Sequence, residues 1–434
     1  MEKYSSYKDS GIYFLPELPS SWQVRKAKYL FNEENRPVRP EDEIVTCFRD
    51  GQVTLRKNRR LEGFTNSMKE IGYQGVRKGD LVIHNMDAFA GSIGVSDSDG
   101  KSTPVYSCCT PKSPDVNQYY YCYLLRYLAH NGFILSLAKG IRERSTDFRF
   151  NDFKELYLPL PSAEEQNAMV AYLDAATAKI DEAIAQQQRM IDLLNERKQM
   201  IIDMVVTKGV PNTHHGTSMK YSGLKWLGCI PSHWSINKLK YLCKMYGRIG
   251  FRGYSASDLV DEGEGAITLS PTNIIDGKLT FTQCSYLSWL KYYESPEIMV
   301  FPGDIVFVKT ASIGKTAYVE STPLETTVNP QILVIKEILP DSEFLTFYLQ
   351  SSFMQGWIKA TANGSTILTI PQTTIGNYPI ALPSIEEQRE IVKHLKHEIG
   401  RIEKAKLSVN NTIALLQERK QIIINDVVTG KVKV

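Results

Sequence analysis

The chain has 434 residues, which is too long for a single hydrophobic core and favours roughly two to four domains. A hydrophobic content of 42%, no apolar run of about 18 residues and no apolar signal segment predict a cytoplasmic protein without membrane contact. The net charge of +3 is far below that of a free-standing nucleic-acid-binding module, and seven scattered cysteines without a Cys-x-x-Cys pair predict neither a disulfide framework nor a zinc site.

The first element of the chain is a globular domain, which we place at residues 1–160. The apolar run Asp80–His84 follows a Gly-Asp turn and predicts a strand, whereas Tyr119–Lys139 predicts a helix. That helical stretch carries five tyrosines, whose spacing indicates core or interface positions rather than a platform for stacked bases. Strands and helices together predict a mixed α/β domain.

Residues 161–208 are predicted to form one long helix. Ser162 is a suitable N-cap, acidic residues follow it, and no Gly or Pro intervenes before Gly209 and Pro211. Apolar residues recur along it at heptad spacing for about four heptads, which predicts a coiled coil. Its apolar seam includes Leu173, Ile180, Ile184, Ile191, Leu194 and Ile201.

The chain then repeats itself. After a linker at 209–219, a second domain is predicted at 220–382 and a second long helix at 383–430. The two helices align without a gap over about 50 residues, which is too long a register for chance. The repeated motifs are Leu-Pro-Ser-x-Glu-Glu-Gln at 160–166 and 382–388, Glu-Arg-Lys-Gln at 196–199 and 418–421, and Val-Val-Thr at 205–207 and 427–429.

The two globular domains also begin alike and then diverge. The spaced Ser-Gly, Leu, Pro-Ser and Trp of residues 10–22 recur at 222–234, and Lys-Tyr-Leu recurs after each. Their interiors share only sparse landmarks, such as Gly79-Asp80 and Gly303-Asp304. Undirected drift after a duplication would also give two related domains. The changes are confined to the domains, however, which favours helices that serve a shared partner and domains that serve different targets.

The second helix carries the same seam and the opposite charge. From the repeated Leu-Pro-Ser onward, the first helix has about three more acids than bases, and the second, to the end of the chain, about three more bases than acids. We therefore expect the helices to pair with each other, antiparallel about a pseudo-twofold axis, although each could instead pack on its own domain. Polar seam residues such as Lys198 and Lys420 would fix the register. The second seam includes Leu395, Ile402, Val409, Ile413, Leu416 and Ile423.

No catalytic or metal-binding motif stands out. Gly314-Lys315-Thr316 lacks the first glycine of a P-loop, because Lys309 occupies that position. Asn329-Pro330 lacks the second proline and the aromatic residue that amino-methyltransferases place around a flipped base. His214-His215 in the linker has no companion ligands and is expected to be solvated. We therefore expect no catalytic residue, cofactor or metal in this chain.

Basic and polar loops are instead candidates for contact with DNA phosphates and base edges. The stretch 49–60 is the densest basic cluster of the chain. Candidates in the first domain are Arg56, Lys57, Arg59, Arg60, Arg142, Arg144 and Arg149. Candidates in the second domain are Arg248, Arg252, Lys309, Thr310, Lys315, Asn363, Ser365 and Thr366. For each of them, an ordinary solvated loop is the alternative interpretation.

The repeated motifs, in this order along essentially the whole chain, resemble the specificity subunit of type I restriction–modification systems. The resemblance implies that each domain is a target recognition domain for one half of a split, asymmetric DNA sequence. It implies that the helices form an antiparallel coiled coil that spaces the half-sites and docks two methyltransferase subunits. Those subunits would bind S-adenosylmethionine and methylate adenine N6, and ATP- and Mg-dependent restriction subunits would complete the complex. This chain would be present as a monomer and hold no cofactor.

Two other hypotheses remain open at this point. A duplicated coiled-coil adaptor that binds proteins without reading DNA would share the same helices. An enzyme with an unrecognised site would need activity of the isolated chain. The modest net charge fits the specificity subunit, since partner subunits would help to hold the DNA.

Overall fold

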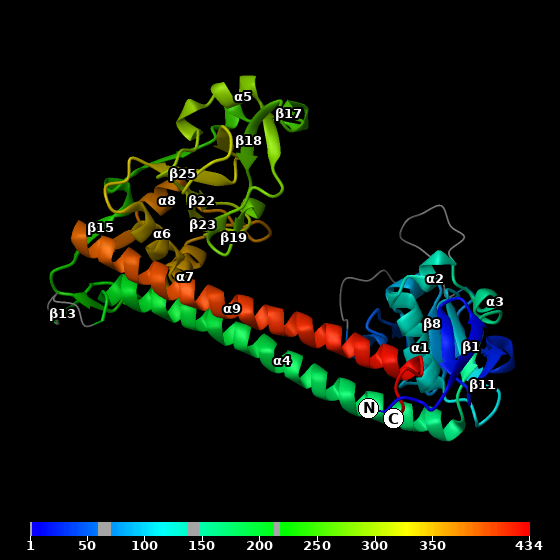
Figure 1. The fold of residues 1–434 in the computed structure, drawn as a ribbon. Coiled ribbons are helices and arrows are strands. Elements are labelled where there is room, and N and C mark those ends of the chain that lie inside the picture. The colour runs from blue at the N-terminus through cyan, green and yellow to red at the C-terminus, as the bar shows by residue number, and fades with distance from the viewer. Residues whose placement is uncertain (1, 60–70, 138–146, 212–217) are drawn as a thin grey trace. The chain divides into compact units, whose positions relative to one another are not determined.

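The computed structural model describes residues 2–59, 71–137, 147–211 and 218–434. It divides into two compact units, one made of Met1–Gln188 with Asn410–Val434 and the other of Arg189–Val409. Each unit therefore contains one globular domain, the first half of the helix that follows this domain, and the last half of the other long helix (Figure 1).

A four-stranded antiparallel sheet lies at the centre of the first domain. Its strands hydrogen-bond in the order β4 (Phe31–Glu34), β11 (Tyr106–Pro111), β8 (Leu81–His84) and β9 (Ile93–Val95). β8 is the strand expected after Gly79-Asp80, and its three apolar residues are buried. Asp80 fixes the turn before it, because its carboxylate accepts a hydrogen bond from the Arg77 backbone N–H at 2.8 Å and pairs with the Arg36 guanidinium.

The rest of the first domain consists of two-stranded ribbons and short helices. The ribbons pair β1 (Tyr7–Ile12) with β2 (Leu15–Pro19), β3 (Gln23–Lys26) with β12 (Tyr157–Leu160), β5 (Val45–Cys47) with β6 (Val53–Leu55), and β7 (Gln74–Val76) with β10 (Gly100–Ser102). The helices are α1 (Gln118–His130) and the single turns α2 (Phe133–Ser136) and α3 (Phe150–Phe153).

α1 ends earlier than the helix expected at Tyr119–Lys139. Gly132 adopts a left-handed φ of 76°, which stops the helix, and residues 138 and 139 lie outside the described part. Tyr120 and Tyr121 are fully buried, and their rings pack edge to face with centroids 5.0 Å apart. These two tyrosines belong to the core, as their helical spacing indicates.

The second domain contains two four-stranded sheets. The first has the order β16 (Lys244–Gly247), β25 (Ile332–Lys336), β22 (Ile305–Val308) and β23 (Thr316–Tyr318). The second has the order β17 (Leu259–Val260), β21 (Ser285–Ser288), β18 (Gly265–Leu269) and β24 (Thr326–Val328). Ribbons pair β13 (Met219–Tyr221) with β14 (Cys229–Pro231), β15 (Ser235–Lys238) with β26 (Pro379–Leu382), and β19 (Ile274–Ile275) with β20 (Lys278–Leu279).

The helix expected at Glu343–Thr361 is in fact two helices, α6 (Ser342–Gln350) and α7 (Ser352–Ala360). Ser351 lies between them with an extended backbone (ψ 149°). The Asp203 carboxylate accepts hydrogen bonds from the backbone N–H of Ser352, at 2.7 Å, and from its hydroxyl. Asp203 of α4 therefore caps the first turn of α7, and α7 begins as a separate helix after Ser351. Two further short helices are α5 (Trp289–Tyr293) and α8 (Gln372–Gly376).

The two domains share one frame beneath their divergent interiors. The sheet order β4-β11-β8-β9 in the first domain matches the order β16-β25-β22-β23 in the second. Strands that take the same place in the sheet also take the same place in the chain order of each domain. The ribbons β1-β2 and β3-β12 likewise match β13-β14 and β15-β26. The landmarks shared in sequence therefore mark a common fold, as expected.

The repeated Leu-Pro-Ser-x-Glu-Glu-Gln motif anchors each long helix to its own domain. Ser162 and Glu165 form a capping box, in which the Ser162 hydroxyl accepts from the Glu165 N–H and the Glu165 carboxylate accepts from the Ser162 N–H, both at 3.2 Å. The indole of Trp22 also donates to Glu165 at 3.4 Å. In the second unit the buried indole of Trp234 donates to Glu387 at 3.1 Å. The tryptophan and the motif are therefore repeated together because they are partners.

The long helices α4 (Ala163–Lys208) and α9 (Ile385–Val428) run antiparallel within each unit. In the first unit Lys420 of α9 pairs with Asp181 of α4 at 2.7 Å. In the second unit Lys198 of α4 pairs with Glu403 of α9 at 3.0 Å. Both lysines come from the Glu-Arg-Lys-Gln motif, so the same contact is made twice with the roles of the helices exchanged.

The apolar seam explains why these helices pair. None of its expected positions is exposed, and Leu173, Leu395 and Ile402 are among the fully or nearly fully buried ones. A mixed α/β fold with two globular domains and an antiparallel coiled coil was expected from the sequence, and this fold class is confirmed.

Replacing Glu387 by leucine is expected to destabilise the second unit by about 1–3 kcal/mol, because the buried Trp234 N–H loses its acceptor. In a unit of this size each kcal/mol lowers the melting temperature by about 2–4 °C, which differential scanning calorimetry resolves. Glu387→Gln keeps an acceptor oxygen and is the control, with an expected loss less than half as large. Equal losses from the two variants would contradict the assigned role of the hydrogen bond.

Candidate nucleic-acid interface

The basic stretch of the first domain lies on β6 and the single turn that follows it. Lys57 pairs with Glu43, and Arg59 pairs with Asp50 at 2.7 Å. The Arg56 guanidinium donates to the Thr46 hydroxyl at 3.1 Å. Arg49 of the same stretch pairs with Asp87 at 3.1 Å, so three of the charges in this cluster are already balanced by carboxylates. Arg60 lies outside the described residues.

The second basic group of the first domain is described only in part. Arg142 and Arg144 lie outside the described residues. Arg149 precedes α3, is exposed, and pairs with Asp147 at 2.7 Å. The hydrogen bond to Asp147 raises the pKa of Arg149, so its guanidinium is charged throughout the accessible pH range.

In the second domain, the loop after β22 meets the polar loop 363–369. Thr310 and Asn363 each form a backbone bridge with Thr369, and the hydroxyls of Thr310 and Thr369 lie 3.0 Å apart. Ser365 and Thr366 are exposed in the same loop. The structure thus brings together candidates that are more than fifty positions apart in the sequence. They offer hydroxyl and amide groups that can both donate and accept hydrogen bonds.

Lys309 stands beside this polar surface with an uncompensated charge. Its side chain is half-buried, and no carboxylate within the described part of the chain pairs with it. Burial lowers the pKa of Lys309. A lysine that is desolvated without a counter-charge costs stability, so it is a candidate for function rather than for folding.

Two other candidates of the second domain have partners within the fold. Arg248 is 6% exposed, and its guanidinium donates to the carbonyl of Val328 and the hydroxyl of Thr327, both at 3.4 Å. Burial lowers the pKa of Arg248. Arg252 pairs with Glu297 at 3.3 Å. Arg248 therefore holds the β24 edge in place and does not present its guanidinium to solvent.

Lys315 lies at the other end of the loop that begins with Lys309. Its ammonium donates to the backbone carbonyls of Pro271 at 3.1 Å and Ile274 at 3.3 Å. The Gly-Lys-Thr of this loop therefore has a structural role in the connection between β22 and β23, which Lys315 ties to neighbouring backbone carbonyls. It lines a groove of about 640 Å³ with Lys198, Lys359 and Lys406.

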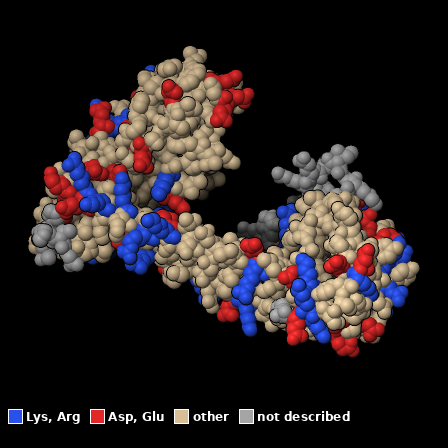
Figure 2. Space-filling model, viewed as in Figure 1, with Lys and Arg blue, Asp and Glu red and all other residues tan. Residues whose placement is uncertain are grey.

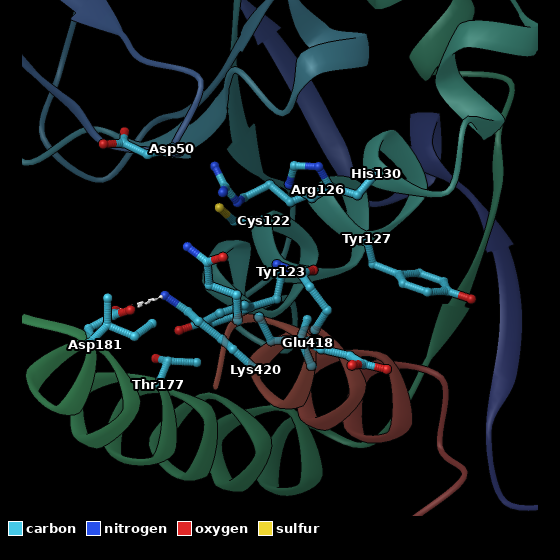
Figure 3. Close-up of a pocket in the computed structure, with 15 residues that line it drawn as sticks. Asp50, Cys122, Tyr123, Arg126, Tyr127, His130, Thr177, Asp181, Glu418 and Lys420 are labelled. Carbon is cyan, nitrogen blue, oxygen red and sulfur yellow. Dashed lines mark hydrogen bonds and ion pairs between the residues drawn. The ribbon is translucent and has the colours of Figure 1, made fainter. Parts of the chain in front are cut away.

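A comparable groove of about 730 Å³ lies in the first unit between α1, α4 and α9 (Figure 3). The ion pair of Asp181 and Lys420 crosses it from helix to helix, as the dashed line in Figure 3 shows. Arg126 of α1 points toward the loop that carries Asp50 and donates to the carbonyl of Gly91 at 2.8 Å. Burial, with the nearby Arg126 charge, lowers the pKa of His130 in the same wall.

Sequence reasoning missed both grooves. Their charged side chains come from helices and loops that are far apart in the chain, and no local motif marks them. The one available signal is the repeated Glu-Arg-Lys-Gln motif, whose lysine lines each groove.

Among the described residues, no group of three or more His, Cys, Asp or Glu side chains could hold a metal ion. Within the same residues, no helix is both long and apolar enough to span a bilayer.

The chain is similar to known proteins over most of its length. Residues 279–411 match the type I restriction modification DNA specificity domain. A protein assigned as the type I restriction enzyme MjaX specificity subunit of Methanocaldococcus jannaschii is 25% identical, over 96% of this chain and 95% of its own length. The MjaVIII specificity subunit of the same organism is 26% identical, over 70% of this chain and 68% of its own.

Among solved structures, one comes from work on the complex assembly and conformational transition of the type I R-M system. That chain covers 96% of this one and 99% of its own length, with a TM-score of 0.70 and 18% identity. The similarity establishes the fold and extends over both globular domains and both long helices. The chain is therefore similar in sequence to type I restriction–modification specificity subunits, and residues 279–411 match their DNA specificity domain.

Proposed function

We propose that the two domains read the two halves of a split, asymmetric DNA sequence. The observation that carries this proposal is that the two domains contain sheets of the same strand order, with different side chains at matching strand ends. β8 ends in His84 and is followed by Asn85, whereas the matching strand β22 ends in Val308 and is followed by Lys309. Two readers with one frame and unlike polar groups would recognise unlike half-sites.

The coiled coil sets the distance between the half-sites in this proposal. Its register is specified at two points, Asp181 with Lys420 and Lys198 with Glu403. These charge pairs contribute only about 0–1 kcal/mol each, but a shifted register would leave the lysines without their partners. The helices would therefore act as a rod of defined length.

The outer face of the coil would dock two copies of one partner, a methyltransferase subunit. Leu193 and Met200 of α4 are each 63% exposed, and the matching Leu415 and Ile422 of α9 are 65% and 50% exposed. Apolar side chains at matching exposed positions of both copies support a partner that binds twice. In this proposal the partners bind S-adenosylmethionine and transfer its methyl group to adenine N6. ATP and Mg belong to restriction subunits, and this chain takes no part in the chemistry.

Co-expression with the cognate methyltransferase is expected to methylate adenines in a motif of two unlike half-sites separated by unspecified bases. Single-molecule sequencing of modified adenines in the host genome measures this directly. A continuous or palindromic motif would count against two different readers. Absence of any modified motif would instead favour a protein-binding adaptor.

Lengthening both helices by one heptad is expected to widen the gap between half-sites. Seven residues inserted after Arg189 of α4 and after Asn411 of α9 lie between the two helix-to-helix ion pairs and preserve the seam. They add about 10 Å, or roughly three base pairs, as read from the methylated motif. The same insertion in α4 alone shifts one helix against the other and should abolish modification. An unchanged gap after the double insertion would contradict the proposal that the coiled coil sets the distance between the half-sites.

Replacing Lys309 by methionine should separate DNA binding from stability. Loss of one charged contact is expected to weaken DNA binding about tenfold, measured by fluorescence anisotropy. Urea unfolding should show no loss of stability, because burial already disfavours the charged lysine. Since its folded-state pKa is lowered, the unfolded chain binds more protons, and wild-type stability should rise relative to the variant as the pH increases toward 10.5.

Arg248→Met is the matched control for that variant. It removes a buried guanidinium and leaves the carbonyl of Val328 and the hydroxyl of Thr327 without their donor. It should therefore lower stability by about 2–4 kcal/mol. If Lys309→Met destabilised the protein as much, Lys309 would be a structural residue.

A further inference from the structure

The groove of the second unit gathers four lysines from four separate segments. Lys198 comes from α4, Lys315 from the loop between β22 and β23, Lys359 from α7 and Lys406 from α9. Figure 2 shows basic side chains gathered over the region of α6, α7 and the first turns of α9. Segments this far apart in the chain place their charges together only in the folded unit.

The carboxylates near these lysines do not balance their charge. Glu403 pairs with Lys198 at 3.0 Å and with Lys406 at 3.3 Å, and Asp276 lines the groove. Four positive charges thus face two negative ones among the described lining and its ion pairs. Lys359 is exposed, and no ion pair joins it to another described residue. Such an excess attracts an anion, most strongly where the walls exclude water.

The walls of the groove are held by hydrogen bonds before any ligand arrives. The Gln350 amide donates to the carbonyls of Gly277 at 3.1 Å and Thr316 at 2.9 Å. The Gln355 amide donates to the carbonyl of Gly314 at 3.0 Å. The Lys315 ammonium uses two of its three N–H groups on carbonyls and retains a third. A groove fixed in this way loses little conformational freedom on binding.

The groove is continuous with the surface proposed to read bases. One loop begins with Lys309 and Thr310 beside loop 363–369 and ends with Lys315 in the groove. A DNA strand whose bases meet the first part of the loop would have neighbouring phosphates within reach of the second. A phosphodiester carries one negative charge per nucleotide, which suits a row of lysines.

The corresponding groove of the first unit differs in charge. It is lined from α9 by Gln417, Lys420, Gln421 and Ile424, which match Asn195, Lys198, Gln199 and Ile202 of α4 in the second groove. Its charges are nearly balanced, however, because the carboxylates of Asp50, Asp181 and Glu418 stand against Lys420 and Arg126 of the lining and Arg59, which pairs with Asp50. The same helix positions therefore frame a basic groove in one unit and a groove of nearly balanced charge in the other.

We propose that the groove of Lys198, Lys315, Lys359 and Lys406 binds backbone phosphates of the DNA strand that the second domain reads. The proposal rests on the proposed function in taking DNA as the ligand. It adds a sequence-independent grip at the junction of the second domain with the coiled coil, whereas the corresponding groove among the described residues of the first unit lacks this excess of lysines.

The test measures how the affinity of the full chain for a random-sequence duplex varies with salt concentration. Lys359→Gln is expected to reduce the slope of log K against log salt by about 0.9, the value for one lost phosphate contact. Lys404→Gln is the control, because Lys404 is exposed on α9 outside the groove and should leave the slope unchanged. Lys359→Arg keeps the charge and should keep the wild-type slope. Circular dichroism checks that the variants fold.

Equal slopes for the Lys359→Gln and Lys404→Gln variants would overturn the proposal, and so would a wild-type chain that does not bind the duplex. Titration with ATP and with inorganic phosphate tests the other source of phosphate. If Lys359→Gln weakened binding of these while leaving the DNA slope intact, the groove would be a site for small phosphate ligands, and the proposal would be wrong. The duplex has a random sequence, so this test is independent of half-site reading. If only the groove proposal is wrong, the methylated motif still has two half-sites. If only half-site reading is wrong, the Lys359→Gln variant still lowers the salt slope.

Discussion

The last turn of each long helix completes the hydrophobic core of the domain that precedes the other helix. Val427 and Val428 of α9 are fully buried in the core of the first domain, and Val205 and Val206 of α4 are fully buried in that of the second. Burying one valine side chain is worth about 1.5–3 kcal/mol, more than an exposed ion pair on the same helices. Each helix is thus held at both ends, by a capping motif where it starts and by a valine pair where it finishes. Antiparallel pairing in one register follows from these two attachments.

This double attachment explains where the two copies of the chain differ. A substitution in the helix disturbs its own domain, its partner helix or a distant core, whereas a substitution after β8 or β22 changes only a loop at a strand end. The strand order tolerates that change, because the sheet is held by buried residues such as Val82 and Val306 beneath the loops. The loops can therefore diverge between the domains while the length and register of the helices remain the same, as the proposed function requires.

The sequence predicted the parts whose cause is local. Ser162 and Gly209 delimit α4, the Gly-Asp turns precede β8 and β22, and the heptads predict the pairing. Features that depend on distant residues were not predictable. Asp203 lies about 150 positions before Ser352, and its contact there separates α6 from α7 within the helix expected at Glu343–Thr361. Glu43 neutralises Lys57, and Arg248 is buried instead of exposed to solvent. The four-lysine groove belongs to the same class, because no segment of the chain carries more than one of its lysines.

The weak net charge is explained by the uneven distribution of charged residues over the two units. The total of +3 includes a basic groove in the second unit, a groove of nearly balanced charge in the first, and a basic stretch at 49–60 that is partly balanced by Glu43 and Asp50. Non-specific attraction for DNA depends on the local arrangement and not on the sum. If the second domain supplies most of that attraction, it would hold DNA first, and the first domain would then test sequence on a strand already bound. Under the proposed function, two readers with one strong electrostatic grip would let the protein release and re-test one half-site without leaving the DNA, which two equally strong grips would hinder.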